Sequence, residues 1–342
     1  MVKMLMIIKS LLIMMCIILF APAVDWTAGG GSGTGGAGGF NTDGNNQSGI
    51  DYGVNPVAST DTAASDAYHK KLASEPLTVS LMSYNLRVDL PQDGINRWKN
   101  RREHVAALIR LYQPDFLGQQ EGLIHQVEYL GKHLPGYAWI GVGRDNGRRA
   151  GELSSIHYNT ERFELVEGSD RTIWLSKTPD LPGKSWDAAY PRILTYGQFR
   201  HKETGETVFV FNTHFDHVGQ TARKNSAKLI LRTIKKVAGS SPYVLLGDFN
   251  VTEDNRVYRI LTGGSPPMKD AFYNTETPHV GPLFTFEGFE VKSSLDKRRI
   301  DFIFVPADAR VLNHAIIGHF RNGYYPSDHL PVYARVQFPT SW

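Results

Sequence analysis

Short apolar runs and two amphipathic segments follow one another along residues 77–338. The apolar runs are rich in Val, Phe and Leu, which is typical of buried strands. They cover residues 77–84, 115–120, 207–215, 243–249, 300–305 and 330–336. Residues 97–112, which end before Pro114, and residues 221–237 show the pattern of helices. Because strands and helices interleave, the pattern predicts one α/β domain over residues 77–342.

The first 76 residues have a different pattern. Lys3 and Lys9 flank the start of an apolar stretch, and small residues at 21–23 offer a cleavage site. Residues 1–23 are therefore predicted to be a secretory signal peptide, with an uncleaved membrane anchor as the alternative. Residues 24–76 are rich in Gly, Ser and Asn and predict a flexible linker. We expect an exported protein, periplasmic or extracellular, that stays tethered to the membrane if the first segment is retained.

Charge and cysteine content restrict the possible partners. The chain of 342 residues has a formal net charge of +3, and loss of the two lysines in the predicted signal lowers it to +1. A nearly neutral protein gives no electrostatic argument for tight binding to a long polyanion. The only cysteine, Cys16, lies within the predicted signal, so we expect no disulfide in the mature protein.

Polar clusters border the apolar runs at six places. They are Ser83-Tyr84-Asn85, Gln119-Gln120-Glu121, Asn212-Thr213-His214, Gly247-Asp248-Phe249-Asn250, Arg299-Ile300-Asp301 and Ser327-Asp328-His329. One polar residue at a strand end is more often a turn former or a cap than a functional group. Six clusters of acid, amide and imidazole groups instead predict a single site that the fold assembles.

The acids and amides of these clusters suit metal-assisted hydrolysis of a phosphoester, which requires a cation, a base for water and donors to the phosphate. Glu121 and Asn85 offer carboxylate and amide oxygens, the ligands that Mg²⁺ prefers. Asp248 and Asn250 are two residues apart and share one face of a strand end. Asp248 can therefore accept a proton from water while Asn250 fixes the water or the phosphate.

The histidines complete this prediction. His214 and His329 are expected to donate hydrogen bonds to phosphate oxygens. A neighbouring carboxylate usually holds such an imidazole in one tautomer, and either Asp301 or Asp328 can do so here.

The order of these motifs resembles the endonuclease/exonuclease/phosphatase superfamily, and the resemblance extends over residues 77–338. It implies a four-layered α/β sandwich, in which two packed mixed β-sheets are flanked by helices, and Mg²⁺ or Mn²⁺ as the cofactor. It also implies that Glu121 is the main metal ligand, with Asn85 and Asp328 near the ion.

The same resemblance implies roles for the other polar residues. Asp248 is expected to be the base that activates water, and Asn250 to position the phosphate. His329 is expected to be the essential imidazole with Asp301 as its partner, and His214 to contact the scissile phosphate.

Specificity is expected to come from residues 138–201, which are predicted to be mostly strands and loops. Within this stretch, residues 174–176 and 184–186 are predicted to cover the mouth of the site. Motifs in this stretch are similar to those of exported bacterial members. Arg144 and Arg192 are predicted to bind a phosphate that is not cleaved, because arginine matches phosphate geometry. Trp174 is predicted to stack on a base or sugar. A solvated loop or simple packing is the alternative for each of these residues.

The function predicted from the sequence is hydrolysis of phosphoester bonds by a water that a metal and Asp248 activate. The substrate is a nucleic acid, a lipid headgroup or a small phosphate ester, so phosphodiesterase or nuclease and phosphatase activities all remain open. The number of metal ions also remains open. The alternative is a non-catalytic or surface-tethered binding module on the same fold. No protein partner is inferred, and a monomer is expected.

Overall fold

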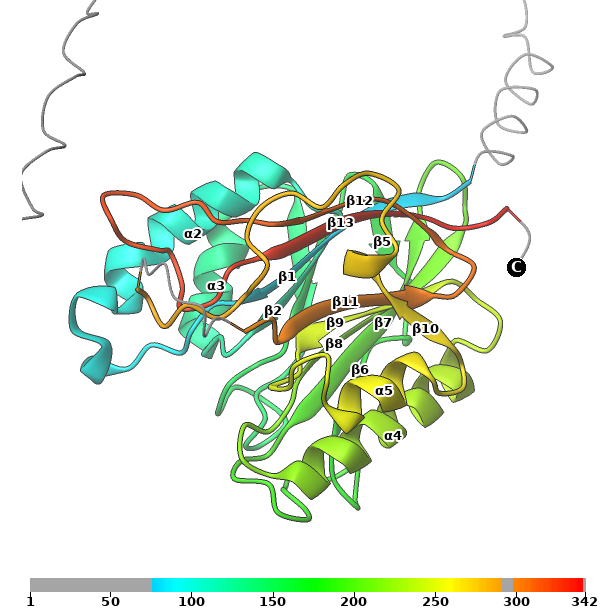
Figure 1. Cartoon of the computed structure of the whole chain (residues 1–342), viewed down its shortest axis with the longest axis horizontal. Coiled ribbons are helices and arrows are strands. Elements are labelled where there is room, and N and C mark those ends of the chain that lie inside the picture. The colour runs from blue at the N-terminus through cyan, green and yellow to red at the C-terminus, as the bar shows by residue number, and fades with distance from the viewer. Residues whose placement is uncertain (1–75, 291–297, 341–342) are drawn as a thin grey trace, which may run out of the picture. The chain divides into compact units, whose positions relative to one another are not determined.

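The structure is a computed structural model that describes residues 76–290 and 298–340 (Figure 1). The predicted signal peptide and the predicted linker up to residue 75 lie outside the described residues. Within the described ranges, no helix is both long and apolar enough to cross a membrane.

Two mixed β-sheets form the centre of the domain. The first sheet has the order β12-β13-β1-β2-β4-β3. Its strands are β1 (Thr78–Asn85), β2 (Phe116–Gln120), β3 (Tyr137–Ile140), β4 (Ile156–Asn159), β12 (Arg310–Ile316) and β13 (Val332–Gln337). The second sheet has the order β10-β11-β9-β8-β7-β5, with β6 also paired to β7. Its strands are β5 (Phe163–Leu165), β6 (Arg171–Trp174), β7 (Ile193–His201), β8 (Thr207–His214), β9 (Tyr243–Asp248), β10 (Met268–Asp270) and β11 (Asp301–Pro306).

Helices cover the outer faces of the two sheets (Figure 1). The helices are α2 (Trp98–Tyr112), α3 (Ile124–His133), α4 (Gln220–Val237) and α5 (Arg256–Thr262), with short 3₁₀ helices η1 (Pro91–Asn96) and η2 (Ala271–Tyr273). The six predicted strands and two predicted helices are confirmed, each to within two residues at its ends.

Three apolar cores separate these layers. Leu81 of β1 and Leu246 of β9 belong to the core between the sheets. The next residue of β1, Met82, belongs to the core shared with α2 and α3, whereas Leu245 of β9 belongs to the core shared with α4 and α5. Successive residues of a strand thus face opposite layers, and both faces are buried. The predicted four-layered α/β sandwich is confirmed.

Strand pairing brings the ends of distant strands to one edge of the sandwich. The parallel pair β1–β2 places Asn85 opposite Gln120, and the parallel pair β8–β9 places His214 opposite Asp248. The antiparallel pair β9–β11 places Asp301 opposite Asp248 as well. Residues 34 to 53 positions apart in the sequence therefore become neighbours at this edge.

A buried amide network joins the two sheets just below this edge. Gln120 Nε2 donates to Asn212 Oδ1 at 2.8 Å, and Asn212 Nδ2 donates to the carbonyls of Gln119 at 2.8 Å and Ser155 at 2.9 Å. Asn212 is fully buried, and a Cβ on Gly118 would lie only 2.8 Å from its Oδ1. The glycine thus permits the close approach that the network requires.

Asn212→Leu is expected to lower the free energy of unfolding by ~2–4 kcal/mol, because it removes three buried hydrogen bonds and places an apolar side chain against the polar groups that made them. Urea unfolding of the two proteins measures the difference. Asn100→Leu is the control, since Asn100 lies on the exposed side of α2 and its replacement is expected to change stability by less than ~0.5 kcal/mol. Equal urea midpoints for Asn212→Leu and the parent protein would contradict a stabilising role for the network.

Candidate active site

Asp248 is the centre of the polar cluster at this edge. Its Oδ2 lies 3.0 Å from Nδ2 of Asn85, 3.4 Å from Nε2 of His214 and 3.7 Å from Nε2 of His329. Its Oδ1 accepts the backbone N–H of Asn250 at 2.9 Å. The Asp248 side chain is buried. One carboxylate therefore contacts groups supplied by both sheets and by the segment before β13.

The surroundings of Asp248 raise the pKa of its carboxyl group toward neutral pH. Burial raises the pKa of Asp248 to about 7, the charge of Asp301 adds to this effect, and the charge of His329 opposes it. A carboxyl group with such a pKa is well matched to accepting a proton at neutral pH.

His329 is paired with Asp301, since its Nδ1 lies 2.8 Å from Asp301 Oδ2. Burial disfavours a charged imidazole, yet the carboxylates of Asp301 and Asp248 raise the pKa of His329 well above its ordinary value. The sequence left open whether Asp301 or Asp328 orients an imidazole. The structure places Asp301 in that position.

Glu121 stands directly after β2 in a left-handed conformation, with φ of 62°. Its Oε1 accepts Nδ2 of Asn85 at 3.0 Å, and its Oε2 accepts the backbone N–H of Val88 at 3.0 Å. Burial opposes ionisation of Glu121, but the charge of His329 and these two hydrogen bonds lower its pKa. Glu121 is thus held as a carboxylate that faces the cluster.

The amide of Asn85 lies between two carboxylates of the cluster. Its Nδ2 donates to both Glu121 and Asp248, and its Oδ1 accepts the backbone N–H of Arg87 at 2.9 Å. In this arrangement Asn85 orients two carboxylates and does not offer its own oxygen to an ion. The prediction that Asn85 lies near the metal ion stays a prediction, and here its amide connects Glu121 and Asp248.

Asp328 is paired with Arg87, since its Oδ2 lies 3.7 Å from Nη1 of Arg87. Burial raises its pKa, and the charge of Glu121 adds to the shift while His329 and Arg87 oppose it. Ser327 Oγ donates to the carbonyl of Asn85 at 2.7 Å. This bond ties the segment that carries Asp328 to the end of β1.

The donor set fits a divalent cation. The ligand atoms of Glu121, His214 and Asp248 lie within 4.8 Å of one another, and so do those of Asp248, Asp301 and His329. Carboxylate oxygens dominate both groups, and Mg²⁺ and Mn²⁺ prefer such oxygens. The carboxylates of these groups can therefore hold a hard divalent ion beside Asp248.

At its Nδ1 atom, His214 contacts a guanidinium, whereas His329 contacts a carboxylate. Its Nδ1 lies 2.9 Å from Nη1 of Arg192, and its Nε2 lies 3.0 Å from Nδ2 of Asn250. Burial holds the pKa of His214 well below its ordinary value, and the charges of Arg192 and Arg144 add to this effect. His214 is thus a neutral imidazole.

Two arginines surround Glu152, a residue for which the sequence predicted no role. Arg144 Nη1 lies 2.5 Å and Arg192 Nη1 3.7 Å from Glu152 Oε2. Burial and the charge of Glu121 raise the pKa of Glu152 to about 7, against the pull of the two arginines. Arg144 and Arg192 are only 8% and 6% exposed. Neither presents the free guanidinium predicted for phosphate binding, because both are buried beside the carboxylate of Glu152.

The prediction for Trp174 is also corrected. Trp174 is 5% exposed, and its Nε1 donates to the carbonyl of Arg144 at 2.7 Å. It therefore packs beneath the segment that carries Arg144 and has no free ring for a substrate.

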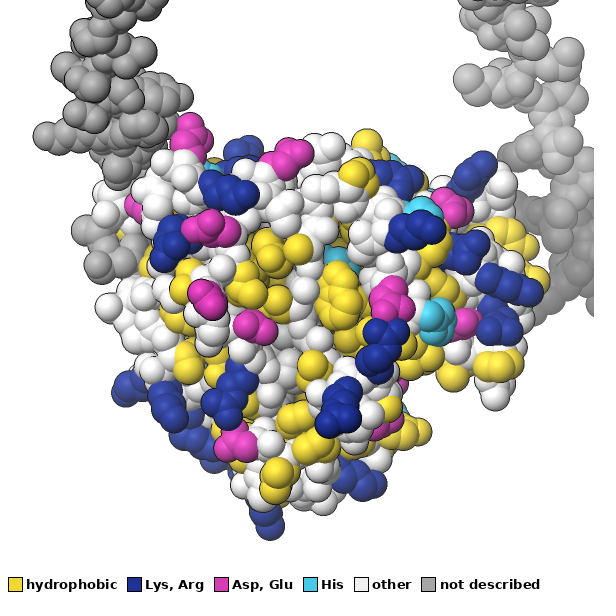
Figure 2. Space-filling view, turned by 180° about the vertical axis from the view of Figure 1, so that it is seen from behind, with side chains coloured by type: hydrophobic (Ala, Val, Ile, Leu, Met, Phe, Trp, Pro, Cys, Tyr) yellow, Lys and Arg dark blue, Asp and Glu magenta, His cyan; other side chains and the backbone are white. Residues whose placement is uncertain are grey.

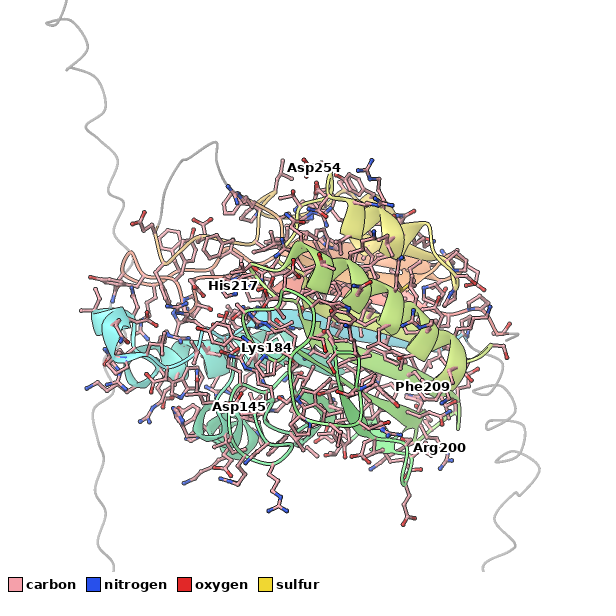
Figure 3. All side chains as sticks on the ribbon, turned by 90° about the horizontal axis from the view of Figure 1, so that it is seen from below. Asp145, Lys184, Arg200, Phe209, His217 and Asp254 are labelled. Atoms are coloured by element: carbon pink, nitrogen blue, oxygen red, sulfur yellow. The ribbon has the colours of Figure 1, made fainter. Side chains whose placement is uncertain are left out.

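The exposed aromatic residue here is Tyr190, which lies over Arg144 at 5.0 Å and stacks on His217. Asp145, Lys184 and His217 lie toward the same side of the molecule in Figure 3.

Asp216 anchors the loop that carries Tyr190. Its Oδ2 accepts the backbone N–H groups of Ala189 and Tyr190, and its Oδ1 accepts those of Val218 and Gly219, at 2.7 to 3.2 Å. Burial favours the neutral acid, but these hydrogen bonds prevail and lower the pKa of Asp216 to about 2.

A folded-state pKa below the unfolded value of 3.8 means that the Asp216 carboxylate stabilises the fold above about pH 4. This contribution is lost as the pH falls from 4 toward 2. Asp216→Asn is expected to lower the free energy of unfolding by ~2 kcal/mol at pH 7 and by much less at pH 2.5. Urea unfolding at both pH values checks this, with exposed Asp180→Asn in the nearby loop as the control. An equal decrease in the free energy of unfolding at the two pH values would contradict the lowered pKa of Asp216.

The chain is similar in sequence and structure to known proteins. The pattern of the family described as "Endonuclease/Exonuclease/phosphatase family" matches residues 82–329. An endonuclease/exonuclease/phosphatase from Bacteroides vulgatus is 38% identical, with a TM-score of 0.74 over 77% of this chain and 100% of that chain.

Two further proteins are similar over most of the domain. The mannosyl-6-phosphatase Bt3783 of Bacteroides thetaiotaomicron VPI-5482 is 36% identical, with a TM-score of 0.70 over 76% of this chain and all of that chain. Uncharacterized protein L388 of Acanthamoeba polyphaga mimivirus is 27% identical over 252 residues, which make up 70% of this chain and 92% of that protein.

Proposed function

This chain belongs to the endonuclease/exonuclease/phosphatase family of phosphoester hydrolases, and we propose that its substrate is a small phosphate monoester of a sugar. The observation that carries hydrolysis is the position of Asp248, whose one carboxylate contacts Asn85, His214 and His329. Support for a sugar phosphate comes from the similarity to a mannosyl-6-phosphatase, which extends over the whole length of that protein.

Mg²⁺ or Mn²⁺ is the proposed cofactor, with Glu121 as its main ligand and Asp328 nearby. When bound, the ion would offset negative charge on the phosphoryl oxygens. Asp248 is proposed to orient the attacking water and accept its proton, for which a pKa of about 7 is suitable. No covalent intermediate with the protein is required.

Three side chains are proposed to hold the phosphate. His329, oriented by Asp301, faces the centre of the site with Nε2. His214 and Asn250 bring further nitrogen atoms to the same place, 3.0 Å from each other. Donors placed around the position of developing negative charge stabilise the transition state.

Surface charge supports a small substrate over a long nucleic acid. Figure 2 shows Lys and Arg side chains interspersed with Asp and Glu over the middle of one face. Mixed charges of this kind form no continuous basic track there, and the formal net charge is only +3. We therefore propose a sugar phosphate, and not a phosphodiester, as the substrate.

Export remains part of the proposal, on the strength of residues 1–23 alone. Fractionation of cells followed by N-terminal sequencing separates the two forms of this proposal. A released protein that begins after Ala23 supports a cleaved signal, and a full-length protein in the membrane fraction supports an anchor. Recovery in the cytoplasmic fraction would contradict both. The monomer predicted from the sequence stays a prediction.

A substrate panel tests the proposed activity. The full-length protein is incubated with mannose 6-phosphate, glucose 6-phosphate, glycerol phosphate, AMP, single-stranded DNA, RNA and sphingomyelin, in Mg²⁺, in Mn²⁺ and in EDTA. We expect metal-dependent release of phosphate, with kcat/KM for a sugar phosphate at least ~100-fold above that for any diester. Faster cleavage of a diester would overturn the proposed substrate. Metal binding without hydrolysis of any ester would favour the non-catalytic binding module.

A further inference from the structure

Arg192 is placed to act on His214 and not on a substrate. It immediately precedes β7, and its guanidinium is 6% exposed. Its Nη1 lies 2.9 Å from Nδ1 of His214, and its Nη2 lies 3.3 Å from Nδ1 of His217. The same guanidinium therefore contacts a ring of the catalytic cluster and a ring at the exposed end of the loop.

Carboxylates on two sides hold Arg192 in this position. Its Nη1 is 3.7 Å from Oε2 of Glu152, and its Nε is 3.7 Å from Oδ2 of Asp216. Asp216 is itself fixed by four backbone N–H groups of the surrounding loops. The guanidinium thus lies between two carboxylates, while its hydrogen-bond contacts are with the two imidazole rings.

A guanidinium has only hydrogen-bond donors and does not lose its proton in proteins. An imidazole nitrogen in hydrogen-bond contact with it must therefore supply a lone pair. For His214 that nitrogen is Nδ1, so the single proton of the neutral ring belongs on Nε2. A proton on Nδ1 would direct two donors at each other across 2.9 Å.

Two neighbours favour the opposite tautomer. Oε2 of Glu152 lies 3.9 Å from Nδ1 of His214, but the same oxygen is held more closely by Nη1 of Arg144, at 2.5 Å. Asn250 Nδ2 lies 3.0 Å from Nε2 of His214 and also donates to the carbonyl of Phe215 at 3.0 Å. An amide is uncharged and can turn over, whereas every edge of a guanidinium is a donor. The contact with Arg192 should therefore outweigh the contact with Asn250.

We propose that Arg192 is a positioning residue that fixes His214 as the Nε2–H tautomer, so that this ring can only donate a hydrogen bond toward the reacting phosphate. Nε2 of His214 faces Oδ2 of Asp248 at 3.4 Å, which directs the N–H into the centre of the site. His329 has the opposite partner at Nδ1, the carboxylate of Asp301. The catalytic part of this inference rests on the proposed function, and the tautomer itself does not.

Selective ¹⁵N labelling of histidine in the full-length protein tests the tautomer directly. The ¹⁵N shifts of both ring nitrogens are measured at pH 8, and the His214 signals are assigned by their loss in His214→Gln. We expect the proton on Nε2 and an unprotonated Nδ1. A proton on Nδ1 of His214 in the parent protein would overturn the proposal, whatever the activity of the protein.

Substitutions of Arg192 test its part in this arrangement. Arg192→Met is expected to move the proton partly to Nδ1 and to lower kcat roughly 10- to 100-fold with little change in KM. Arg192→Lys should keep the Nε2–H tautomer, because an ammonium is also only a donor, and should recover part of kcat. Arg144→Met is the matched control for the spectrum, since Arg144 binds the same Glu152 without touching His214.

The outcomes separate this proposal from the proposed function. An unchanged tautomer in a folded Arg192→Met protein would overturn the proposal. If that variant does not fold, loss of the Nε2–H tautomer in Arg192→Lys would overturn it instead. A protein that hydrolyses no ester, yet shows the expected shifts, would contradict only the proposed function and the catalytic role of His214.

Discussion

Asp248→Asn is expected to lower kcat by at least roughly 10³-fold while the protein stays folded. Asparagine has nearly the same shape but cannot accept a proton from water, and it lacks the charge that attracts a cation. The effect should be large because Asp248 contacts Asn85, His214 and His329 at once. Phosphate release under saturating substrate and Mg²⁺ measures kcat.

Thermal unfolding of the same variant separates catalysis from stability. Burial and the charge of Asp301 raise the pKa of Asp248, which shows that the ionised form is disfavoured in the fold. A neutral amide is therefore expected to leave the Tm of the metal-free protein unchanged or higher. The control is Asp254→Asn, an exposed residue six positions further on, which should keep the parent activity. A kcat for Asp248→Asn within tenfold of the parent would exclude Asp248 as the base.

Glu121→Gln is expected to weaken binding of Mn²⁺ and Mg²⁺ by at least roughly 100-fold and to lower kcat/KM in proportion at low metal concentration. Glutamine keeps the size of the side chain but removes the charge that the hydrogen bonds from Asn85 and Val88 hold in place. Titration calorimetry with each metal measures affinity. In the parent protein, EDTA should abolish hydrolysis and added Mg²⁺ should restore it.

The matched control for this substitution is Glu128→Gln. Glu128 is an exposed residue of α3 that pairs with Arg149 away from the site, so its loss should leave metal affinity unchanged. Parent-like metal affinity in Glu121→Gln would show that another carboxylate of the cluster is the main ligand. Raised metal concentration should partly restore the activity of Glu121→Gln but not that of Asp248→Asn.

Much of the fold could be predicted because buried strands of a mixed sheet require uninterrupted apolar runs. The elements that were not predicted have weaker patterns. In β12 (Arg310–Ile316) the register shifts between Val311 and Asn313, so the alternation with period two is broken. In α3 (Ile124–His133) only Gln126, Val127 and Leu130 are buried, and so short an apolar face gives little periodicity.

The sequence alone determined the main polar residues of the cluster. Glu121, His214, Asp248 and Asp301 each stand where an apolar run begins or ends, and buried charges require partners. Strand pairing then brings such positions to a common edge of the sandwich. For this reason their convergence could be inferred without coordinates.

Only the tertiary structure decided what the residues of the loops do. Arg144, Arg192 and Trp174 have side chains that suit either a substrate or a packed interior, and local sequence does not distinguish the two. Arg144 and Arg192 are buried beside Glu152, and Trp174 donates to the carbonyl of Arg144. The direction of a guanidinium is set by the charged groups that surround it in three dimensions, so a residue that looked like a phosphate ligand instead lies against His214.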